Sequence, residues 1–149
     1  MKNKIDLTWS ILCSSSSVDF ESNNLTLSNI IDEITIPDAL FTERPANVDS
    51  VEINFNLQLV SLWSRTEQTA ADSDIVVKIE LIDPDGKSLN TTEFNFQFPA
   101  NKTRMRQRTN IPILVITNPG IYNFRVSTKS EGTDFKKVYD TPLIVNRGT

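Results

Sequence analysis

The sequence predicts an all-β protein, an immunoglobulin-like antiparallel β-sandwich of about seven to nine strands. Three observations lead to this prediction. Apolar and polar side chains alternate along most of the chain, residues that favour strands are frequent, and turn signals separate the alternating runs. The chain has 149 residues, of which 38% are hydrophobic, and this suits a single domain, 1–149, with one core. A β-barrel is the alternative architecture.

The clearest alternation begins at Val51 and ends at Trp63. Every second residue is apolar, and polar residues such as Glu52 and Asn54 lie between them. A half-buried strand sorts these residues onto two faces, whereas a helix would scatter them around its axis. The same reasoning predicts strands at about 5–13, 25–35, 49–63, 74–82, 92–98, 103–109, 111–117 and 121–128, with a terminal strand near 136–146.

Turn signals fall between these runs. The strongest is Asp83-Pro84-Asp85-Gly86, because proline fixes φ at the second turn position and glycine accepts a positive φ. The sequence Asn118-Pro119-Gly120 is a second turn signal. The serine run 14–17 predicts a flexible hairpin loop, and 66–73 predicts an exposed loop or a short helical turn.

Three stretches carry a resemblance to known proteins. They are a first strand that ends in Leu12-Cys13 and leads through a hairpin into 25–34, then 79–86, and then 119–126. In this order they resemble a family of small bacterial and phage-associated β-sandwich proteins of unknown function. Asn29 stands where similar sequences have glycine. The resemblance implies a sandwich and no particular chemistry, because fold does not determine function.

Composition narrows the function classes. The chain has no histidine, which removes the usual general base, the Ser–His and Cys–His nucleophile pairs and histidine-based metal sites. Its four glycines are dispersed, so no glycine-rich phosphate loop exists. The sequence therefore predicts no catalytic residues, no cofactor and no metal site.

The cysteine count and the N-terminus bear on location. Cys13 is the only cysteine, so no internal disulfide can form, which favours a reducing compartment. Met1 to Cys13 has some likeness to a lipoprotein signal, but Asp6 interrupts the apolar run and Leu12 precedes the cysteine. We therefore expect a cytoplasmic protein without a membrane span, an exported or phage-associated protein being the alternative. Cys13 itself is predicted to be a buried structural thiol.

Paired acids, which could be metal ligands or a glycosidase pair, occur at Asp32/Glu33, Asp72/Asp74 and Asp83/Asp85. Asp72 and Asp74 lie at the start of the strand predicted at 74–82, whereas Asp83 and Asp85 follow its end. The two pairs should therefore lie at opposite ends of that strand and share no site. The favoured interpretation is solvated turn residues.

The most unusual feature is a row of cations at Lys102, Arg104, Arg106 and Arg108, which we call the basic stripe. Period-two spacing places all four on one face of an extended segment. They could bind an anionic partner, such as an acidic protein patch, a phosphate backbone or an acidic lipid surface. Two structural interpretations compete: charges that protect an edge strand from edge-to-edge pairing, and charges paired with acidic cross-strand neighbours.

These observations favour a non-enzymatic binding or structural module that contacts another macromolecule through its loops, a sheet edge or the basic stripe. Its partner is expected to be a protein, with homo-oligomerisation through an edge strand as a further option. Nucleic acid is disfavoured by the net charge of −4 and by aromatic residues that do not interleave with the cations. Trp9 and Trp63 are expected in the core, with a rim aromatic at an interface as the alternative. The alternative function is a carboxylate- or metal-dependent hydrolase.

Overall fold

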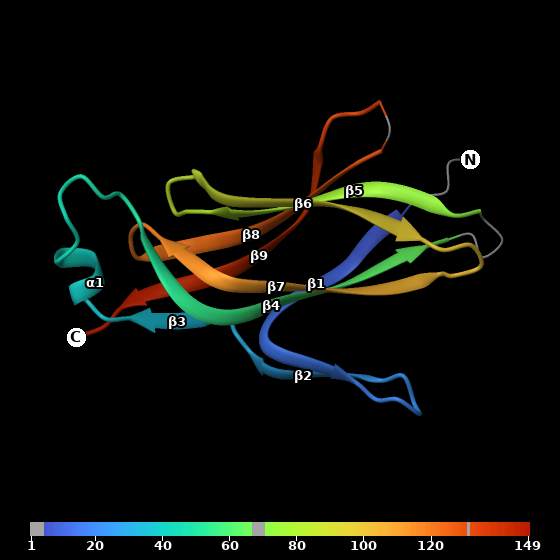
Figure 1. Cartoon of the computed structure of the whole chain (residues 1–149), viewed down its shortest axis with the longest axis horizontal. Helices are drawn as coiled ribbons and strands as arrows, with labels where there is room; N and C mark the ends of the chain where they lie inside the picture. The colour runs from blue at the N-terminus through green and yellow to red at the C-terminus, as the bar shows by residue number, and fades with distance from the viewer. Residues whose placement is uncertain (1–4, 67–70, 131) are drawn as a thin grey trace.

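The computed structural model describes residues 5–66, 71–130 and 132–149 (Figure 1). Within these residues the chain forms nine strands and one short helix. In chain order these are β1 (Ile5–Val18), β2 (Leu25–Ile30), β3 (Glu33–Ile36), α1 (Ala39–Thr42), β4 (Val51–Arg65), β5 (Ser73–Ile82), β6 (Ser88–Phe98), β7 (Arg104–Ile116), β8 (Gly120–Lys129) and β9 (Lys136–Arg147).

The strands form two packed sheets, so the predicted all-β sandwich is confirmed. One sheet has four strands in the order β2-β1-β4-β7, and the other has five in the order β3-β9-β8-β5-β6. Neighbouring strands are antiparallel, except that β3 runs parallel to β9. The two sheets stay separate, and the four-stranded one curls because β1 turns away from the sandwich together with β2 (Figure 1).

The core lies between the sheets and follows the predicted alternation. In β4 the inward residues Leu57, Leu59 and Trp63 are buried, and their polar neighbours lie on the other face. In β6 Phe96 and Phe98 are buried, and Phe94 packs partly buried against the same core. Apolar side chains on alternate residues of each sheet therefore meet in one layer, which is what stabilises a sandwich.

Three boundary predictions are wrong. The serines at 14–17 do not form a loop: they belong to β1 and pair with β2, so the turn lies further along, between Val18 and Leu25. The single strand expected at 25–35 is two strands in different sheets, because β3 leaves β2 to join β9. The segments 103–109 and 111–117 are one continuous strand, β7, which contains Pro112. Proline is tolerated there because β7 is an edge strand.

Half of the segment predicted as a loop or helical turn at 66–73, residues 67–70, lies outside the described residues, and Ser73 begins β5. The turn at Asp83–Gly86 is confirmed, since the Gly86 amide donates to the Asp83 carbonyl at 3.0 Å and Gly86 has a φ of +88°. No helix in the described part of the chain has the length and apolar character needed to cross a membrane.

Candidate binding groove

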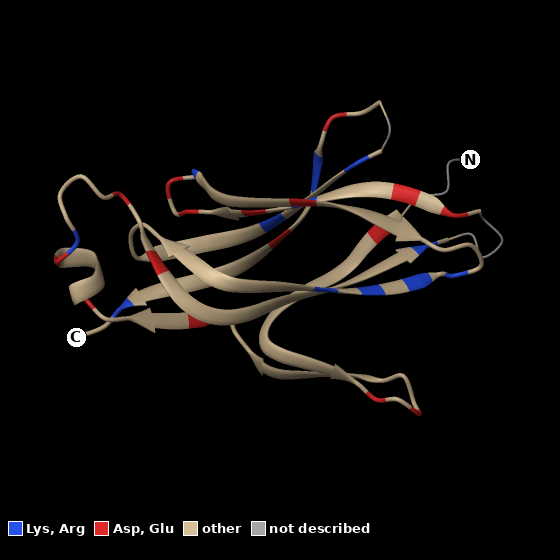
Figure 2. Ribbon diagram, viewed as in Figure 1, with Lys and Arg blue, Asp and Glu red and all other residues tan. Residues whose placement is uncertain are grey.

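The basic stripe lies on and just before β7, at the edge of the four-stranded sheet. Lys102, Arg104, Arg106 and Arg108 are exposed, whereas Thr103, Met105, Gln107 and Thr109 between them are half-buried. Figure 2 shows the cations as successive blue bands along β7. The prediction that the four cations share one face is therefore confirmed.

The cross-strand neighbours of the stripe are neutral. Arg104, Arg106 and Arg108 lie opposite Ser64, Leu62 and Val60 of β4. Within the described residues no carboxylate lies within ion-pair distance of the four cations. The interpretation that acidic cross-strand neighbours neutralise the stripe is therefore wrong, and its positive charge faces solvent.

The hairpin of β1 and β2 lies beside this cationic face and converts it into a groove. An Arg106 Nη1 donates to the Asn23 carbonyl at 2.8 Å, and an Arg108 Nη1 donates to the Ser16 carbonyl at 3.4 Å. The space between the hairpin and this face is open to solvent and has a volume of about 480 Å³. We call this space the basic groove, and its lining residues are Val18, Asn23, Leu25, Leu62, Lys102, Arg104, Met105, Arg106 and Arg108.

A buried arginine holds the start of the stripe in place. Arg65, only 4% exposed, donates from Nε to the Lys102 carbonyl at 2.7 Å and from Nη2 to the Pro99 carbonyl at 2.6 Å. Its guanidinium also lies 4.7 Å from the centre of the Phe98 ring. Charge-assisted bonds to carbonyls fix a loop backbone strongly. Sequence reasoning missed this role, and the only signal was a charged residue at an inward position of the β4 alternation.

The two tryptophans differ in position. Trp63 is buried in the core, as predicted, and its Nε1 donates to the Gln107 side chain at 3.1 Å. Trp9 is half-buried and lies opposite Leu62 on the outer face of the four-stranded sheet. The prediction of a core position is therefore wrong for Trp9, because a bulge between Leu7 and Trp9 shifts the face of β1.

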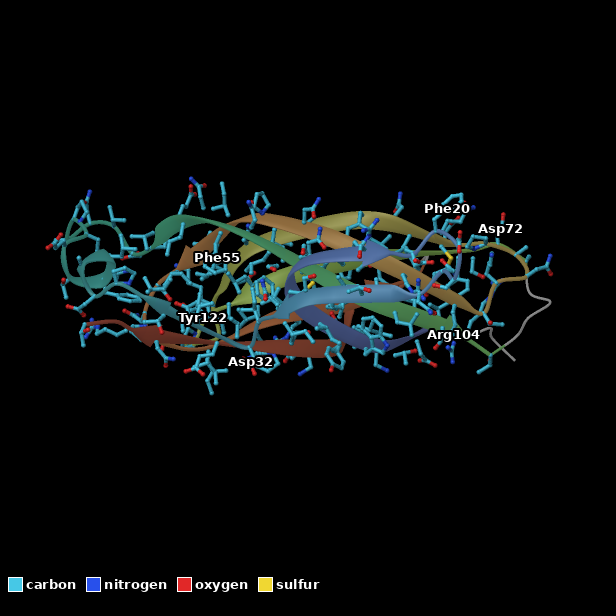
Figure 3. All side chains as sticks on the ribbon, turned by 90° about the horizontal axis from the view of Figure 1, so that it is seen from below. Phe20, Asp32, Phe55, Asp72, Arg104 and Tyr122 are labelled. Atoms are coloured by element: carbon cyan, nitrogen blue, oxygen red, sulfur yellow. The ribbon has the colours of Figure 1, made fainter. Side chains whose placement is uncertain are left out.

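The turn of the hairpin, residues 19–23, carries a feature that sequence reasoning also missed. We call these residues the hairpin tip. Phe20 is fully exposed there, although phenylalanine is usually buried. Figure 3 shows Phe20 and Arg104 toward the same end of the molecule. The sequence signal was Phe20 between Asp19 and Glu21, outside every alternating run.

Of the acids considered as metal ligands, Asp83 lies in a turn but is buried, so the prediction of a solvated residue is wrong for it, and Asp74 is an exposed residue of β5. Asp83 is 6% exposed and accepts the backbone amides of Asp85 and Lys87 and the Thr117 hydroxyl, at 2.9, 2.8 and 3.1 Å. Asp72 accepts the Ala100 amide at 2.5 Å. Asp72 precedes β5 and Asp83 follows it, so the prediction that they lie at opposite ends of this strand is confirmed. In the described ranges no three acids or cysteines gather closely enough to hold a metal ion.

Cys13 is a buried thiol, as predicted. It lies in β1 opposite Ile30 and Gln58, where the hairpin leaves the sandwich. Burial raises the pKa of the Cys13 thiol, which lowers its reactivity because the thiolate is the nucleophile.

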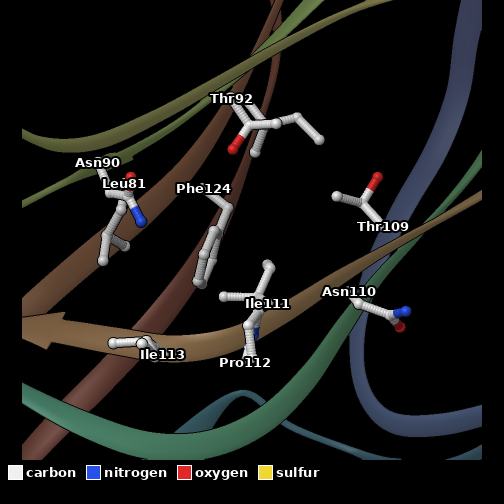
Figure 4. A pocket seen from close by; sticks show the side chains of 10 residues that line it. Leu81, Asn90, Thr92, Thr109, Asn110, Ile111, Pro112, Ile113 and Phe124 are labelled. Atoms are coloured by element: carbon white, nitrogen blue, oxygen red, sulfur yellow. The ribbon is translucent and has the colours of Figure 1, made fainter.

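A second, smaller space of about 200 Å³ lies on the other side of β7, between the edges of the two sheets (Figure 4). Its floor is apolar and its rim carries neutral polar side chains. The residues around it are Ile79, Leu81, Asn90, Thr92, Thr109, Asn110, Ile111, Pro112, Ile113 and Phe124.

Comparison with known proteins adds no family to this description: no family model matches the chain, and no curated protein matches its sequence.

Proposed function

We propose that the protein is a non-enzymatic binding module whose basic groove takes up an acidic segment of a partner protein. The observation that carries this proposal is an exposed row of four cations that, among the described residues, lie within ion-pair distance of no carboxylate and that line a groove between an edge strand and the hairpin. Charged edges also prevent strand pairing, but edge protection alone does not require a groove.

The chemistry of the groove favours a protein partner. Cations line it together with apolar side chains, including Leu25, Leu62 and Met105. A segment that mixes carboxylates with apolar residues would satisfy both kinds of lining, since the carboxylates gain charge-assisted bonds and the apolar groups leave water. None of the described residues that line the groove is aromatic, and stacking on aromatics is the usual means of holding single-stranded nucleic acid.

The net charge of −4 also bears on where an acidic partner segment would bind. An excess of acidic over basic residues disfavours acidic segments across the molecule as a whole, so the basic groove is where such a segment would be attracted. The lone buried thiol fits a reducing compartment, and we infer a cytoplasmic location on this ground. We also propose, from the sequence resemblance, that the chain is related to the small bacterial and phage-associated β-sandwich proteins.

Charge reversal of Lys102 and Arg104 tests the proposal. These two are the better choice because Arg106 and Arg108 also hold the hairpin, whereas Arg104 makes no bond to it. A fluorescent peptide of alternating glutamate and leucine should bind the wild type, and K102E/R104E should weaken binding about tenfold or more. Fluorescence anisotropy measures both affinities, and binding should also weaken at high salt.

The matched control is K87E/K136E, which changes the net charge equally at two exposed lysines outside the groove. This control should bind the peptide nearly as well as the wild type. If both variants lost the same peptide affinity while their melting temperatures stayed unchanged, the effect would be one of general charge, and this would contradict the proposal.

A further inference from the structure

The hairpin tip is held rigidly by one aspartate. Asp19 Oδ1 accepts the backbone amides of Glu21 and Ser22, at 3.0 and 2.7 Å, and the Ser22 hydroxyl at 2.9 Å. The Asn23 amide donates to the Asp19 carbonyl at 2.9 Å, and Asn23 takes a left-handed φ of +59°, which asparagine tolerates. Arg106 then ties Asn23 to the sandwich. The turn is therefore formed before any partner arrives.

This turn presents Phe20 to solvent, with exposed acidic residues on either side. The hydrogen bonds from Ser22 and Glu21 lower the pKa of Asp19 further below neutrality. A preformed turn binds with little ordering cost, and a buried aromatic is a frequent energetic centre of an interface. The complementary surface would have an apolar floor for the ring and cations around it.

The basic groove has this composition. Its apolar side chains, which include Val18, Leu62 and Met105, lie among the four cations. Arginine also interacts favourably with the face of an aromatic ring. We infer that the acidic segment bound by the groove is the hairpin tip of a second copy of this chain. This inference rests on the proposed function, because both use the same groove.

The arrangement on one chain suits a reciprocal dimer. Asn23 of the hairpin tip lines the groove, and Phe20, three residues earlier, faces outward. Because the tip and the groove are adjacent, one two-fold axis can place each tip in the other copy's groove. Such an exchange buries both Phe20 rings and pairs the acids of each tip with the cations of the other chain. An anionic lipid surface suits the tip less well, because Asp19 and Glu21 would be repelled.

Sedimentation velocity over a range of protein concentrations tests the inference. The wild type should dimerise, and F20S should raise the dimer dissociation constant about tenfold or more, as loss of an interface anchor does. The turn should survive, since Asp19 bonds to Glu21 and Ser22 and not to Phe20. The matched control is I30S, which removes a 63% exposed side chain elsewhere in the hairpin and should dimerise normally.

A charge exchange identifies the contacting surfaces. K102E/R104E should be monomeric, and so should E21K. Combining E21K with K102E/R104E in one chain restores complementary charges across the interface, and dimerisation should return. A dimer in which F20S has no effect, or a combined variant that stays monomeric, overturns the inference. Attachment of the wild type to phosphatidylserine vesicles through Phe20, without dimerisation, overturns it as well.

The outcomes separate this inference from the proposed function. F20S leaves the groove intact, so it should still bind the glutamate-leucine peptide, and K102E/R104E should not. A monomeric wild type that binds the peptide would contradict the second-copy inference and keep the proposed function. A dimer that depends on Phe20 but is indifferent to K102E/R104E would contradict the second-copy inference alone, and a wild type that neither dimerises nor binds the peptide would contradict both.

Discussion

Tyr122 is the residue on which one end of the sandwich depends. Its side chain is fully buried, and its hydroxyl accepts the backbone amides of Thr117 and Asn118, at 2.9 and 3.1 Å. The same hydroxyl donates to the Asn118 carbonyl at 2.5 Å. Immunoglobulin-like sandwiches use such a tyrosine corner to fix the connection between two strands. Here it fixes the turn from β7 into β8.

The substitution Tyr122→Phe tests this role. It keeps the ring but leaves two backbone amides without their acceptor, so the free energy of unfolding should fall by about 1–3 kcal/mol. The control Tyr139→Phe removes the hydroxyl of a tyrosine that is 36% exposed and should change stability by less than about 0.5 kcal/mol. Urea denaturation measures both variants. If both variants lost the same free energy of unfolding, the hydrogen bonds of the Tyr122 hydroxyl would not stabilise the turn.

Among individual residues, the sequence predicted the roles of those that belong to a repeating pattern. It did not predict the roles of residues that depend on contacts formed only in the folded protein. The basic stripe was visible because its spacing repeats every second residue. Arg65 was not, because its partners include carbonyls of residues far along the chain, at Pro99 and Lys102. The role of Phe20 was equally hidden, since one aromatic in a polar segment does not reveal whether it will be exposed.

At the scale of elements, the β1–β2 hairpin is the part that completes the basic groove. Beyond Cys13 it leaves the sandwich, and within its own strands it pairs only with itself (Figure 1). Its links to the rest of the protein include Ser16 Oγ, which donates to Gln58 at 2.6 Å, and the bond from Arg106 to the Asn23 carbonyl. Few links make local opening easier than global unfolding.

Removal of the Arg106 link should therefore loosen the hairpin. We expect Arg106→Ala to increase amide hydrogen exchange across 14–30, with little change in β5 and β8. Arg104→Ala is the matched control, because it removes an arginine from the same face without breaking a bond to the hairpin. Exchange followed by mass spectrometry of peptides from this region measures the difference. Identical exchange in both variants would show that Arg106 does not hold the hairpin.

The strands themselves were the most predictable elements, and their ends were the least. The alternation in β4, β5 and β8 identifies each strand because one face is buried in every case. The serines of β1 gave no such signal, because 14–17 lie where β1 is paired but largely outside the core. The split of 25–35 depends on the pairing of β3 with β9, a contact between distant segments that local patterns do not contain.

At the scale of the whole molecule, the two long sides of the sandwich differ. On one side β1 lies against β9, where the Thr141 hydroxyl donates to the Ser10 carbonyl at 3.3 Å. On the other side the edge strands β6 and β7 leave the space of about 200 Å³ between them (Figure 4). This space is open to solvent, so a larger apolar side chain that covered its apolar lining would remove more surface from water.

Filling that space should stabilise the fold. Thr92 lies opposite Ile79, a core residue, and both line the space. Thr92→Leu should therefore raise the free energy of unfolding by about 0.5–2 kcal/mol, since cavity-filling substitutions have this effect. Thr91→Leu is the control: Thr91 lies opposite Glu80 on the outer face, so the same change should stay within about 0.5 kcal/mol. Urea denaturation compares the two, and a Thr92→Leu variant less stable than the wild type would show that the two sheets are already in tight contact along this side.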